Sequence, residues 1–379
     1  MKRRSFLQNS ASKAALGMSS TALLIACGQT QTVEQSTAVA QTVITSRPIL
    51  QWKMATSWPK KLDILFGGAE RLCRRVRDMT DGRFSITPYA SGELTPGLNV
   101  LDVVSAGTVE CGHTASYYYV DKNPALAFGT TLPFGLNTAQ QNAWLYYGGG
   151  LQAIQALYKP FGIINFPAGN TGVQMGGWFR KQIEQPNDLN SLKMRIPGIG
   201  GQVMKRLGVD VQVLAADEIA PALLDGSIAA DEWNNHYDDD KIGITKAAPY
   251  YYYPGWWEPG ATYELQINQA QWESLPTAYQ AALKTAAAEI TTTMPAEYNA
   301  KNGHGLQRLK QNGTQVMPFN QEILTAAYAE TTQLYEEYAD SSTDFRRLYT
   351  QWKQFKAQIY SWNRINELSF DQFVMGMVN

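Results

Sequence analysis

From residue 50 onward, short strand-like segments alternate with longer segments that have helical spacing. Residues 50–56 alternate apolar and polar side chains as a half-buried strand does, and residues 62–79 carry apolar residues at helical spacing before the turn Asp81-Gly82. We expect further strands at 84–88, 109–113, 162–167, 172–178, 193–195, 211–214 and 228–233, and helices at 98–106, 202–207 and 218–224. Strands that alternate with helices predict βαβ units and mostly parallel sheets, so the expected fold class is α/β.

The chain becomes mainly helical after residue 269. A run from 275 to about 311 is rich in Ala, Thr, Lys and Glu, and a helix of this length is expected to brace two lobes. Residues 342–373 are also expected to be helical. They carry one apolar stripe at helical spacing, made of Leu348, Trp352, Phe355, Ile359, Trp362 and Ile365.

Composition excludes several classes of protein. The 379 residues suffice for two or three domains, and 32 Lys and Arg against 33 Asp and Glu argue against a general nucleic-acid binder. With 44% hydrophobic and 17% charged residues, disorder as the overall state is excluded. Aromatic residues reach 11%, which favours a protein that encloses a small molecule. After the N-terminal segment, no uncharged apolar run approaches the ~20 residues that a transmembrane helix needs.

The first 27 residues have the pattern of an export signal. Lys2, Arg3 and Arg4 precede a weakly apolar stretch at 14–26, and Arg3-Arg4-Ser5-Phe6-Leu7 resembles the twin-arginine signal. Leu24-Ile25-Ala26-Cys27 resembles a bacterial lipobox, which predicts a lipid anchor at Cys27; an ordinary signal peptide with a chance Cys is the alternative. Residues 28–48 are almost uncharged and polar, so we expect a flexible tether.

Three Cys and three His are too few and too scattered for a zinc site or a disulfide framework. Cys73 and Cys111 are expected to be two buried free thiols, with a disulfide between them as the alternative. The histidines show neither triad nor metal spacing, and no G-x-S-x-G, Walker or G-x-G-x-x-G motif stands at a strand–helix turn.

Arg195 ends the expected strand 193–195 and is followed by Pro197-Gly198. A guanidinium in that place can bind a ligand carboxylate through two parallel hydrogen bonds; an ion pair with a neighbouring Asp is the alternative.

The segment Asp231-Glu232-Trp233-Asn234 ends another expected strand, at the edge where open α/β sheets bind ligands. Strand alternation would turn Asp231 and Trp233 to one side and Glu232 to the other, so at most one carboxylate should face a given cleft. One carboxylate, an amide and backbone carbonyls suit a hard cation; a helix cap beside a core Trp is the alternative.

Tyrosines and tryptophans cluster in two segments, 117–119 and 250–258. Aromatic walls with hydroxyl tips enclose and orient small polar ligands, and Tyr118 is the candidate chosen here.

Several motifs in order resemble one family. They are Asp188-Leu189, residues 192–198, Gly200-Gly201, Leu207-Gly208, residues 226–233 and residues 252–256. The series resembles the solute-binding receptors of TRAP transporters, in the branch that binds 2-oxo monocarboxylates, and it covers roughly residues 50–370. The resemblance implies two α/β lobes around a ligand cleft, joined by crossing strands and a long lobe-spanning helix. The boundaries expected are 49–172 with about 262–300 for lobe I, 173–261 with about 301–341 for lobe II, and 342–379 for a C-terminal helical segment.

The resemblance also assigns roles to residues. Arg195 matches the arginine that binds the ligand carboxylate, while Gln174, Glu232 and the Trp233 carbonyl match the groups that hold a metal cation. The predicted ligand-binding set is Arg195, Gln174, Trp233, Tyr118 and Asn234, and the predicted metal set is Gln174, Glu232 and Trp233. One departure stands after Trp233, where Asn234-Asn235-His236 replaces small apolar residues and Gly-Pro, so a more polar cleft wall is expected.

We therefore expect a periplasmic solute receptor that binds a 2-oxo or 2-hydroxy monocarboxylate with a cation and delivers it to a TRAP permease, without catalysis. One protein carboxylate favours sodium over calcium, although the ligand's own charge keeps calcium open. The alternatives are a secreted metal-dependent enzyme with Glu232 as general base, and a receptor that feeds a signalling partner. The C-terminal helix is expected to pack on its own lobe; the alternative that the resemblance adds is a homodimer in which two subunits exchange this helix.

Overall fold

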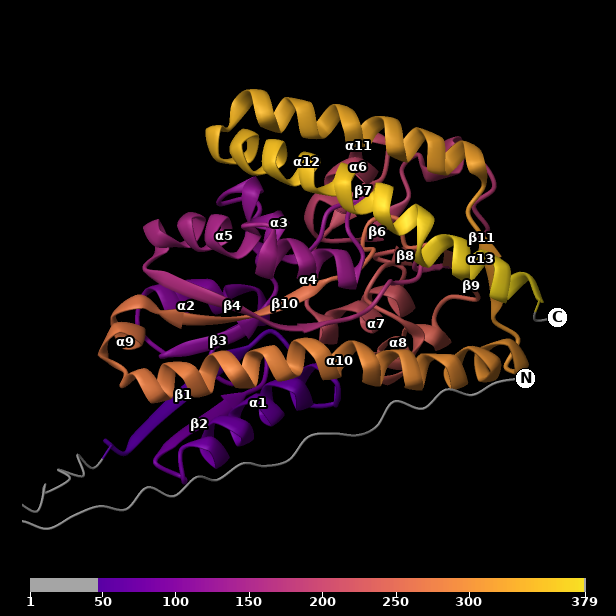
Figure 1. The fold of residues 1–379 in the computed structure, drawn as a ribbon. Coiled ribbons are helices and arrows are strands. Elements are labelled where there is room, and N and C mark those ends of the chain that lie inside the picture. The colour runs from indigo at the N-terminus through magenta and orange to yellow at the C-terminus, as the bar shows by residue number, and fades with distance from the viewer. Residues whose placement is uncertain (1–46, 378–379) are drawn as a thin grey trace, which may run out of the picture. The chain divides into compact units, whose positions relative to one another are not determined.

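Two mixed β-sheets form the cores of the part of the chain that the computed structural model describes, residues 47–377 (Figure 1). The first sheet has the order β2-β1-β3-β10-β4 and consists of β1 (Leu50–Thr56), β2 (Phe84–Tyr89), β3 (Cys111–Thr114), β4 (Ile163–Asn170) and β10 (Thr262–Asn268). The second has the order β11-β9-β5-β8-β6-β7 and consists of β5 (Trp178–Phe179), β6 (Lys193–Arg195), β7 (Asp210–Gln212), β8 (Ala230–Asp231), β9 (Tyr250–Tyr253) and β11 (Gln315–Pro318).

The expected α/β class is confirmed, but the sheets are less parallel than expected. In the first sheet β10 runs antiparallel to both of its neighbours, and in the second sheet β5 does the same. The other strand pairings of the described residues, β1 with β2 and β3, β6 with β7 and β8, and β9 with β11, are parallel. Both exceptions are strands that begin where the chain crosses from one sheet to the other.

Helices pack on both sheets. Those near the first sheet are α1 (Leu65–Met79), α2 (Val100–Ser105), α3 (Ala127–Thr130), α4 (Thr138–Tyr147), α5 (Gly150–Tyr158) and α9 (Gln269–Ser274). Those near the second sheet are α6 (Gly198–Arg206), α7 (Ala216–Asp225) and α8 (His236–Ile242). The face of α1 that repeats at helical spacing is buried in the core, as its sequence pattern predicts.

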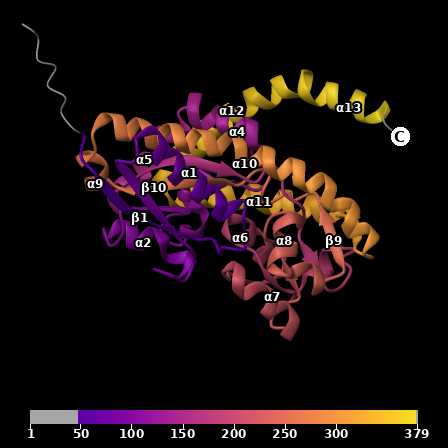
Figure 2. The same cartoon turned by 90° about the horizontal axis from the view of Figure 1, so that it is seen from below.

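Long helices connect the two sheets. α10 (Thr277–Gln311) packs against β4 and α1 at the first sheet and against α8 at the second, and Figures 1 and 2 show it running past both. Its 35 residues span about 52 Å at ~1.5 Å per residue, which confirms the predicted bracing helix. α11 (Gln321–Ser341) contacts α6, while α12 (Thr343–Ile365) contacts α4 and α5, so this pair forms a second connection.

The chain also crosses between the sheets in two irregular segments, 171–177 and 254–261, which bond to each other. The backbone N–H of Gln174 donates to the Glu258 carbonyl (3.2 Å), and Gly255 N–H donates back to the Gln174 carbonyl (3.1 Å). The strand predicted at 172–178 is therefore wrong: only Trp178 and Phe179 form β5. Gly172 and Gly177 adopt positive φ values (76° each), which breaks the strand and frees the intervening backbone for these bonds.

An ion-pair cluster on the surface joins α8, near the second sheet, to the residues that precede α1, near the first sheet. Asp63, which precedes α1, accepts a hydrogen bond from the Tyr237 hydroxyl of α8 (2.9 Å) and pairs with Lys241 of α8. Lys301 of α10 lies 3.5 Å from the same carboxylate. The Asp63 side chain is half exposed.

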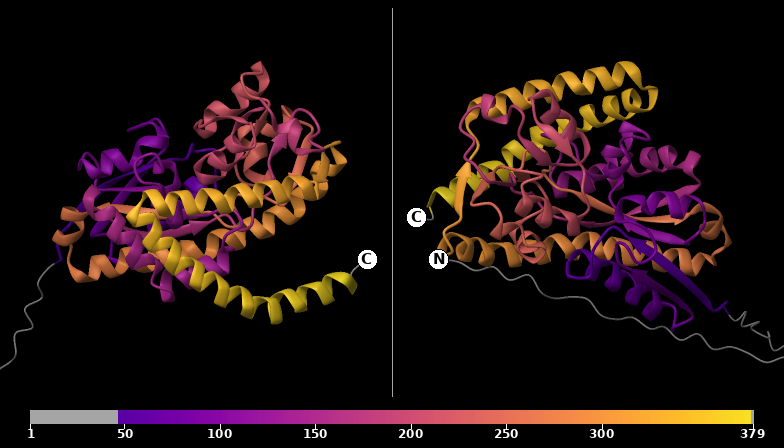
Figure 3. Two further views of the ribbon diagram at one scale, coloured as in Figure 1. Left: turned by 90° about the horizontal axis from the view of Figure 1, so that it is seen from above. Right: turned by 180° about the vertical axis from the view of Figure 1, so that it is seen from behind.

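The C-terminal stripe is half buried and half exposed. Leu348 and Trp352 are buried against the body of the chain, whereas Trp362 and Ile365 are 59% and 73% exposed. The final helix α13 (Glu367–Met377) has no buried residue and extends away from the other helices (Figures 2 and 3).

Cys73 and Cys111 are buried and unbridged, so the prediction of two free thiols is confirmed. Within residues 47–377, none of the helices combines the length and apolar character that crossing a membrane requires. The predicted export signal (1–27), with Cys27, and nearly all of the predicted tether (28–48) lie outside the described residues.

Candidate functional site

Arg195 is the central cationic group of the candidate site. It is the last residue of β6, its side chain is 1% exposed, and its Nη1 donates to the backbone carbonyl of Glu232. Nε donates to the Leu214 carbonyl at 3.3 Å. Nη2 is buried and has no partner, so one edge of the guanidinium remains available to a ligand oxygen.

Two carboxylates face this guanidinium. Asp231 Oδ1 lies 3.9 Å from Arg195 Nε, and Glu232 Oε2 lies 3.6 Å from Nη1. The expectation that at most one of these carboxylates faces a given cleft is wrong, because β8 ends at Asp231 and the strand alternation ends with it.

The site holds more buried carboxyl groups than cationic groups. Burial raises the pKa of Asp231 to about 8, and burial together with repulsion from Glu258 raises the pKa of Glu232 well above its ordinary range. Burial likewise raises the pKa of Glu258. Burial acts to lower the pKa of Arg195, but its carboxylate neighbours outweigh burial, so the guanidinium stays charged. The carboxylates therefore favour an additional positive charge.

The amide of Gln174 has a defined orientation. Its Nε2 faces three acceptors, Glu258 Oε2 (2.8 Å), Asn234 Oδ1 (3.0 Å) and Thr171 Oγ1 (3.1 Å). Its carbonyl oxygen Oε1 is buried without a partner. This oxygen is consequently available to a cation; the role of Gln174 as a cation ligand stays a prediction.

Glu258 is a member of the site to which the sequence analysis gave no role. It is 3% exposed, lies on the second crossing segment, and bonds Gln174 through both backbone and side chain. The available signal was weak: one carboxylate at the end of the aromatic run 250–258, after Pro254-Gly255.

Aromatic side chains enclose the guanidinium. Its Cζ lies 4.9 Å from the centroid of the Trp233 ring, a cation–π distance. Tyr118, from the first sheet's side, acts electrostatically to raise the pKa of Arg195. Its neighbour Tyr117 packs on Gly198, where an added Cβ would come within 2.8 Å of the Tyr117 ring; Gly198 also has φ +64°. Glycine here permits α6 and the tyrosine segment to meet.

The residues present fit a hard cation. Gln174 Oε1 and both carboxylate oxygens of Glu232 are buried without hydrogen-bond partners, and Glu258 adjoins them through Gln174. Oxygen donors of this kind suit sodium or calcium. Among residues 47–377 no group of three or more His, Cys, Asp and Glu is arranged to hold a metal, so this set depends on an amide oxygen in addition to carboxylates.

Asn234, a predicted ligand contact, is engaged by protein groups. Its Oδ1 accepts from Gln174 and from the Tyr263 hydroxyl (3.1 Å), and its Nδ2 donates to Asp238 Oδ2 (3.0 Å). Direct contact of Asn234 with a ligand stays a prediction.

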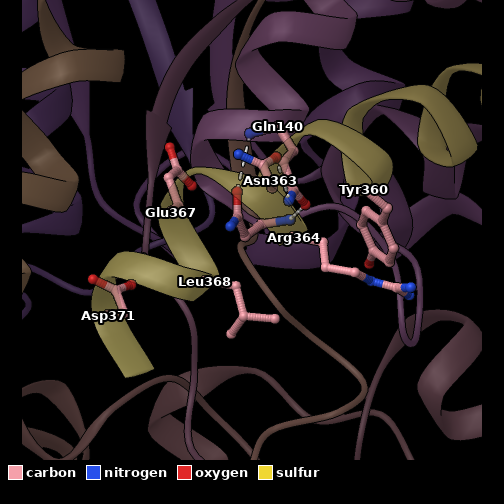
Figure 4. Close-up of a pocket in the computed structure, with 8 residues that line it drawn as sticks. Gln140, Tyr360, Asn363, Arg364, Glu367, Leu368 and Asp371 are labelled. Atoms are coloured by element: carbon pink, nitrogen blue, oxygen red, sulfur yellow. Dashed lines mark hydrogen bonds between the residues drawn. The ribbon is translucent and has the colours of Figure 1, made fainter. Parts of the chain in front are cut away.

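A cavity of about 320 Å³ lies elsewhere, between α4, α12 and α13 (Figure 4). Its lining residues are Asn137, Gln140, Tyr360, Asn363, Arg364, Glu367, Leu368 and Asp371. Gln140 Nε2 donates to Asn363 Oδ1 within it (2.9 Å). None of its residues belongs to the Arg195 set, so we do not assign it to the solute.

Residues 54–341 match the family of bacterial extracellular solute-binding proteins, family 7. The match covers well over half of the chain, which therefore belongs to this family.

Relatives of known description agree with this assignment. A monocarboxylate 2-oxoacid-binding periplasmic protein from Nostoc sp. (strain PCC 7120) is 54% identical over 373 residues, 98% of this chain and 99% of the relative. A TRAP transporter solute-binding protein from Bordetella bronchiseptica RB50, a dimer with copurified calcium and picolinate, has a TM-score of 0.86 and 46% identity, covering 87% of this chain and 98% of that chain. A TRAP periplasmic solute-binding protein from Pseudoalteromonas atlantica T6c, with sodium and pyruvate, has a TM-score of 0.83 and 33% identity, covering 85% and 98%. The resemblance to TRAP receptors and the two-lobed fold expected from it are confirmed.

Replacement of Arg195 by Ala is expected to lower stability as well as remove a ligand contact. Asp231 and Glu232 would lose their buried cationic partner, a change that typically costs about 3–5 kcal/mol. Denaturant unfolding at neutral pH measures the loss. Arg206→Ala is the matched control, because Arg206 pairs with Glu330 and Glu337 near the surface and exposed pairs contribute at most about 1 kcal/mol. Equal losses in the two variants would contradict the central role of Arg195.

Proposed function

We propose that the chain is the extracytoplasmic solute receptor of a TRAP transporter and binds a small 2-oxo or 2-hydroxy monocarboxylate together with a sodium or calcium ion. The observation that carries this proposal is a set of buried polar atoms without hydrogen-bond partners, namely Arg195 Nη2, Gln174 Oε1 and the two Glu232 oxygens. Glu232 Oε2 lies 3.6 Å from Arg195 Nη1, and Glu258, which repels Glu232, bonds Gln174. One group is a donor suited to a carboxylate, and the others are acceptors suited to a cation. The names of the Nostoc, Bordetella and Pseudoalteromonas relatives support the same ligand class.

Each residue of the set has a proposed role. Arg195 binds the solute carboxylate, and Trp233 and Tyr118 enclose it. Gln174, Glu232, Glu258 and the Trp233 carbonyl hold the cation, which when bound offsets repulsion between the solute's oxygens and the protein carboxylates. The preference for sodium rested on a single protein carboxylate. Because Glu258 adds a second, the charge balance suits calcium at least as well.

We propose that binding closes two lobes, with the boundaries expected from the sequence: 49–172 with about 262–300, and 173–261 with about 301–341. Gln174 and Glu258 lie on the crossing segments themselves, while Arg195 belongs to the second sheet and Tyr118 to the side of the first. A ligand bound by all four residues links the two lobes. Small-angle X-ray scattering should show a smaller radius of gyration with solute than without it.

We propose binding and delivery to a membrane permease, without catalysis. His113 is committed to Trp58 (2.7 Å) and to the Ala168 carbonyl (2.8 Å), so it is not available as a base for the Arg195 set. Solute recovered chemically unchanged after long incubation supports this proposal, whereas turnover would favour the metal-dependent enzyme with Glu232 as general base.

Solute affinity is expected to depend on the cation. In metal-stripped buffer, calorimetric titration of pyruvate or a larger 2-oxo acid should give weak binding, and sodium or calcium should restore it. Glu232→Gln keeps the shape of the side chain and removes its charge, so it should abolish this dependence. Glu264→Gln is the control, since Glu264 is buried in the first sheet and bonded to Tyr158 and Asn165. Wild-type affinity that is identical in all buffers would rule out the cation.

We further propose a homodimer formed through the C-terminal helix. The exposed apolar residues at the end of the chain are Trp362, Ile365, Leu368, Phe370, Phe373, Met375 and Met377. A surface of this kind favours a partner, and the Bordetella relative is described as a dimer. A second copy that exchanges the helix would cover it.

Truncation after Asn366 is expected to give a monomer by sedimentation velocity while the full chain is a dimer. This cut removes only α13 and keeps the buried residues Leu348 and Trp352 of α12. Phe370→Ser with Phe373→Ser should act in the same direction without shortening the chain. A full chain that is monomeric at every concentration would contradict the dimer.

We propose that the receptor is exported through the twin-arginine pattern at Arg3-Arg4 and anchored by lipid at Cys27. Replacing both arginines by Lys should leave unprocessed chain in the cytoplasm, and Cys27→Ser should release soluble chain or stall maturation. Cell fractionation distinguishes these outcomes. Cleaved chain that stays on the membrane after Cys27→Ser would contradict lipidation.

A further inference from the structure

A chain of hydrogen bonds runs from the long helix α10 to the amide of Gln174. The Tyr298 hydroxyl of α10 donates to Asp238 Oδ2 (2.5 Å), and Asn234 Nδ2 donates to the same oxygen (3.0 Å). Asn234 Oδ1 in turn accepts from Gln174 Nε2 (3.0 Å). All four side chains are at least 96% buried.

The shape of an amide does not decide which of its ends is the oxygen, because the carbonyl and the NH₂ group have nearly the same size. Its hydrogen-bond partners decide. An ionised carboxylate only accepts, so Asp238 draws the NH₂ group of Asn234 toward itself and turns Asn234 Oδ1 toward Gln174. The Tyr263 hydroxyl donates to the same oxygen and favours the same orientation.

The orientation of the Asn234 amide in turn determines that of the Gln174 amide. Gln174 meets an oxygen at Asn234 and presents Nε2 there, which leaves Oε1 as its free end. Thr171 and Glu258 also accept from Nε2. Glu258, however, belongs to the proposed set of cation ligands. Asn234 and Asp238 are not in that set, so they can orient Gln174 without binding the cation themselves.

We propose that Asp238 and Asn234 are positioning residues of the cation site: Asp238 fixes the direction of the Asn234 amide, and Asn234 fixes that of Gln174, so that the Gln174 carbonyl oxygen faces the cation. This inference rests on the proposed cation-assisted binding. Removing a residue that orients a metal ligand without contacting the metal commonly lowers metal affinity about 10–100-fold.

The test is Asp238→Asn, which keeps the side-chain shape but replaces an acceptor with an amide that can face either way. Burial raises the pKa of Asp238 to about 7, so titrations at pH 8.5 keep the wild-type residue ionised. We expect calcium affinity, measured in metal-stripped buffer with a saturating 2-oxo acid, to fall about tenfold or more. Solute affinity at saturating calcium should change much less, a split that general loss of folding would not produce.

Asp239→Asn is the matched control. Asp239 is the next residue of α8 and equally buried, but it accepts from the Trp178 indole (2.8 Å) and the Tyr251 hydroxyl (3.3 Å). It reaches Asn234 only at the backbone N–H (3.4 Å). This variant removes one buried charge, as Asp238→Asn does, and that charge also acts on Glu232. It should lower the melting temperature and reduce calcium affinity much less than Asp238→Asn does, because it leaves the orientation of the Asn234 amide unchanged. Equal losses of calcium affinity in both variants, or none in Asp238→Asn, would overturn the proposal.

A double-mutant cycle with Gln174→Ala identifies the route of the effect. If Asp238 acts through Gln174, Asp238→Asn should cost little further calcium affinity once Gln174 is Ala. Additive losses would overturn the proposed route. A wild-type chain that binds neither calcium nor sodium would instead contradict the proposed function, so the two failures are distinguishable.

Discussion

The guanidinium of Arg195 faces two buried carboxylates, and a third buried carboxylate, Glu258, repels Glu232 and bonds the Gln174 amide. Removing charged groups from water costs several kcal/mol for each ion, and attraction repays that cost only when opposite charges match. Here one guanidinium is set against three carboxyl groups, and burial raises the pKa of each of them, so they hold protons in the neutral range unless further positive charge is present. In the proposed site a bound cation supplies that charge, which links the binding of an anionic solute to the binding of the cation.

The crossing segments carry two residues of the candidate site. Gln174 and Glu258 bond to each other across the two strands of chain that join the sheets. In a receptor with two lobes these segments are where the backbone bends. In the proposed site two of the cation ligands, Gln174 and Glu258, lie on these segments, so the proposal predicts that cation binding acts directly on them.

Local patterns predicted much of this arrangement. Arg195 was identifiable because it ends a short strand and Glu232 because it directly follows one, and the 35-residue helix α10 because its composition is uniform over its whole length. The error at 172–178 has a non-local cause: Gln174 and its neighbours bond to residues more than 75 positions away, and nothing in the segment itself encodes that pairing. Glu258 was missed for the same reason, since its role depends on the first crossing segment. The predicted alternation of side chains does not extend to Glu232, because β8 ends one residue earlier.

The contact of Asp63 with Tyr237 and Lys241 differs in kind from the contacts around Arg195. It is half exposed, and dissolved ions screen exposed charges over about 8 Å at physiological ionic strength. Arg195, at 1% exposure, is shielded from that screening. The contact of Asp63 with Lys241 is consequently sensitive to the ionic strength of the surroundings, whereas the charges around Arg195 respond to the groups that bind among them and not to dissolved salt.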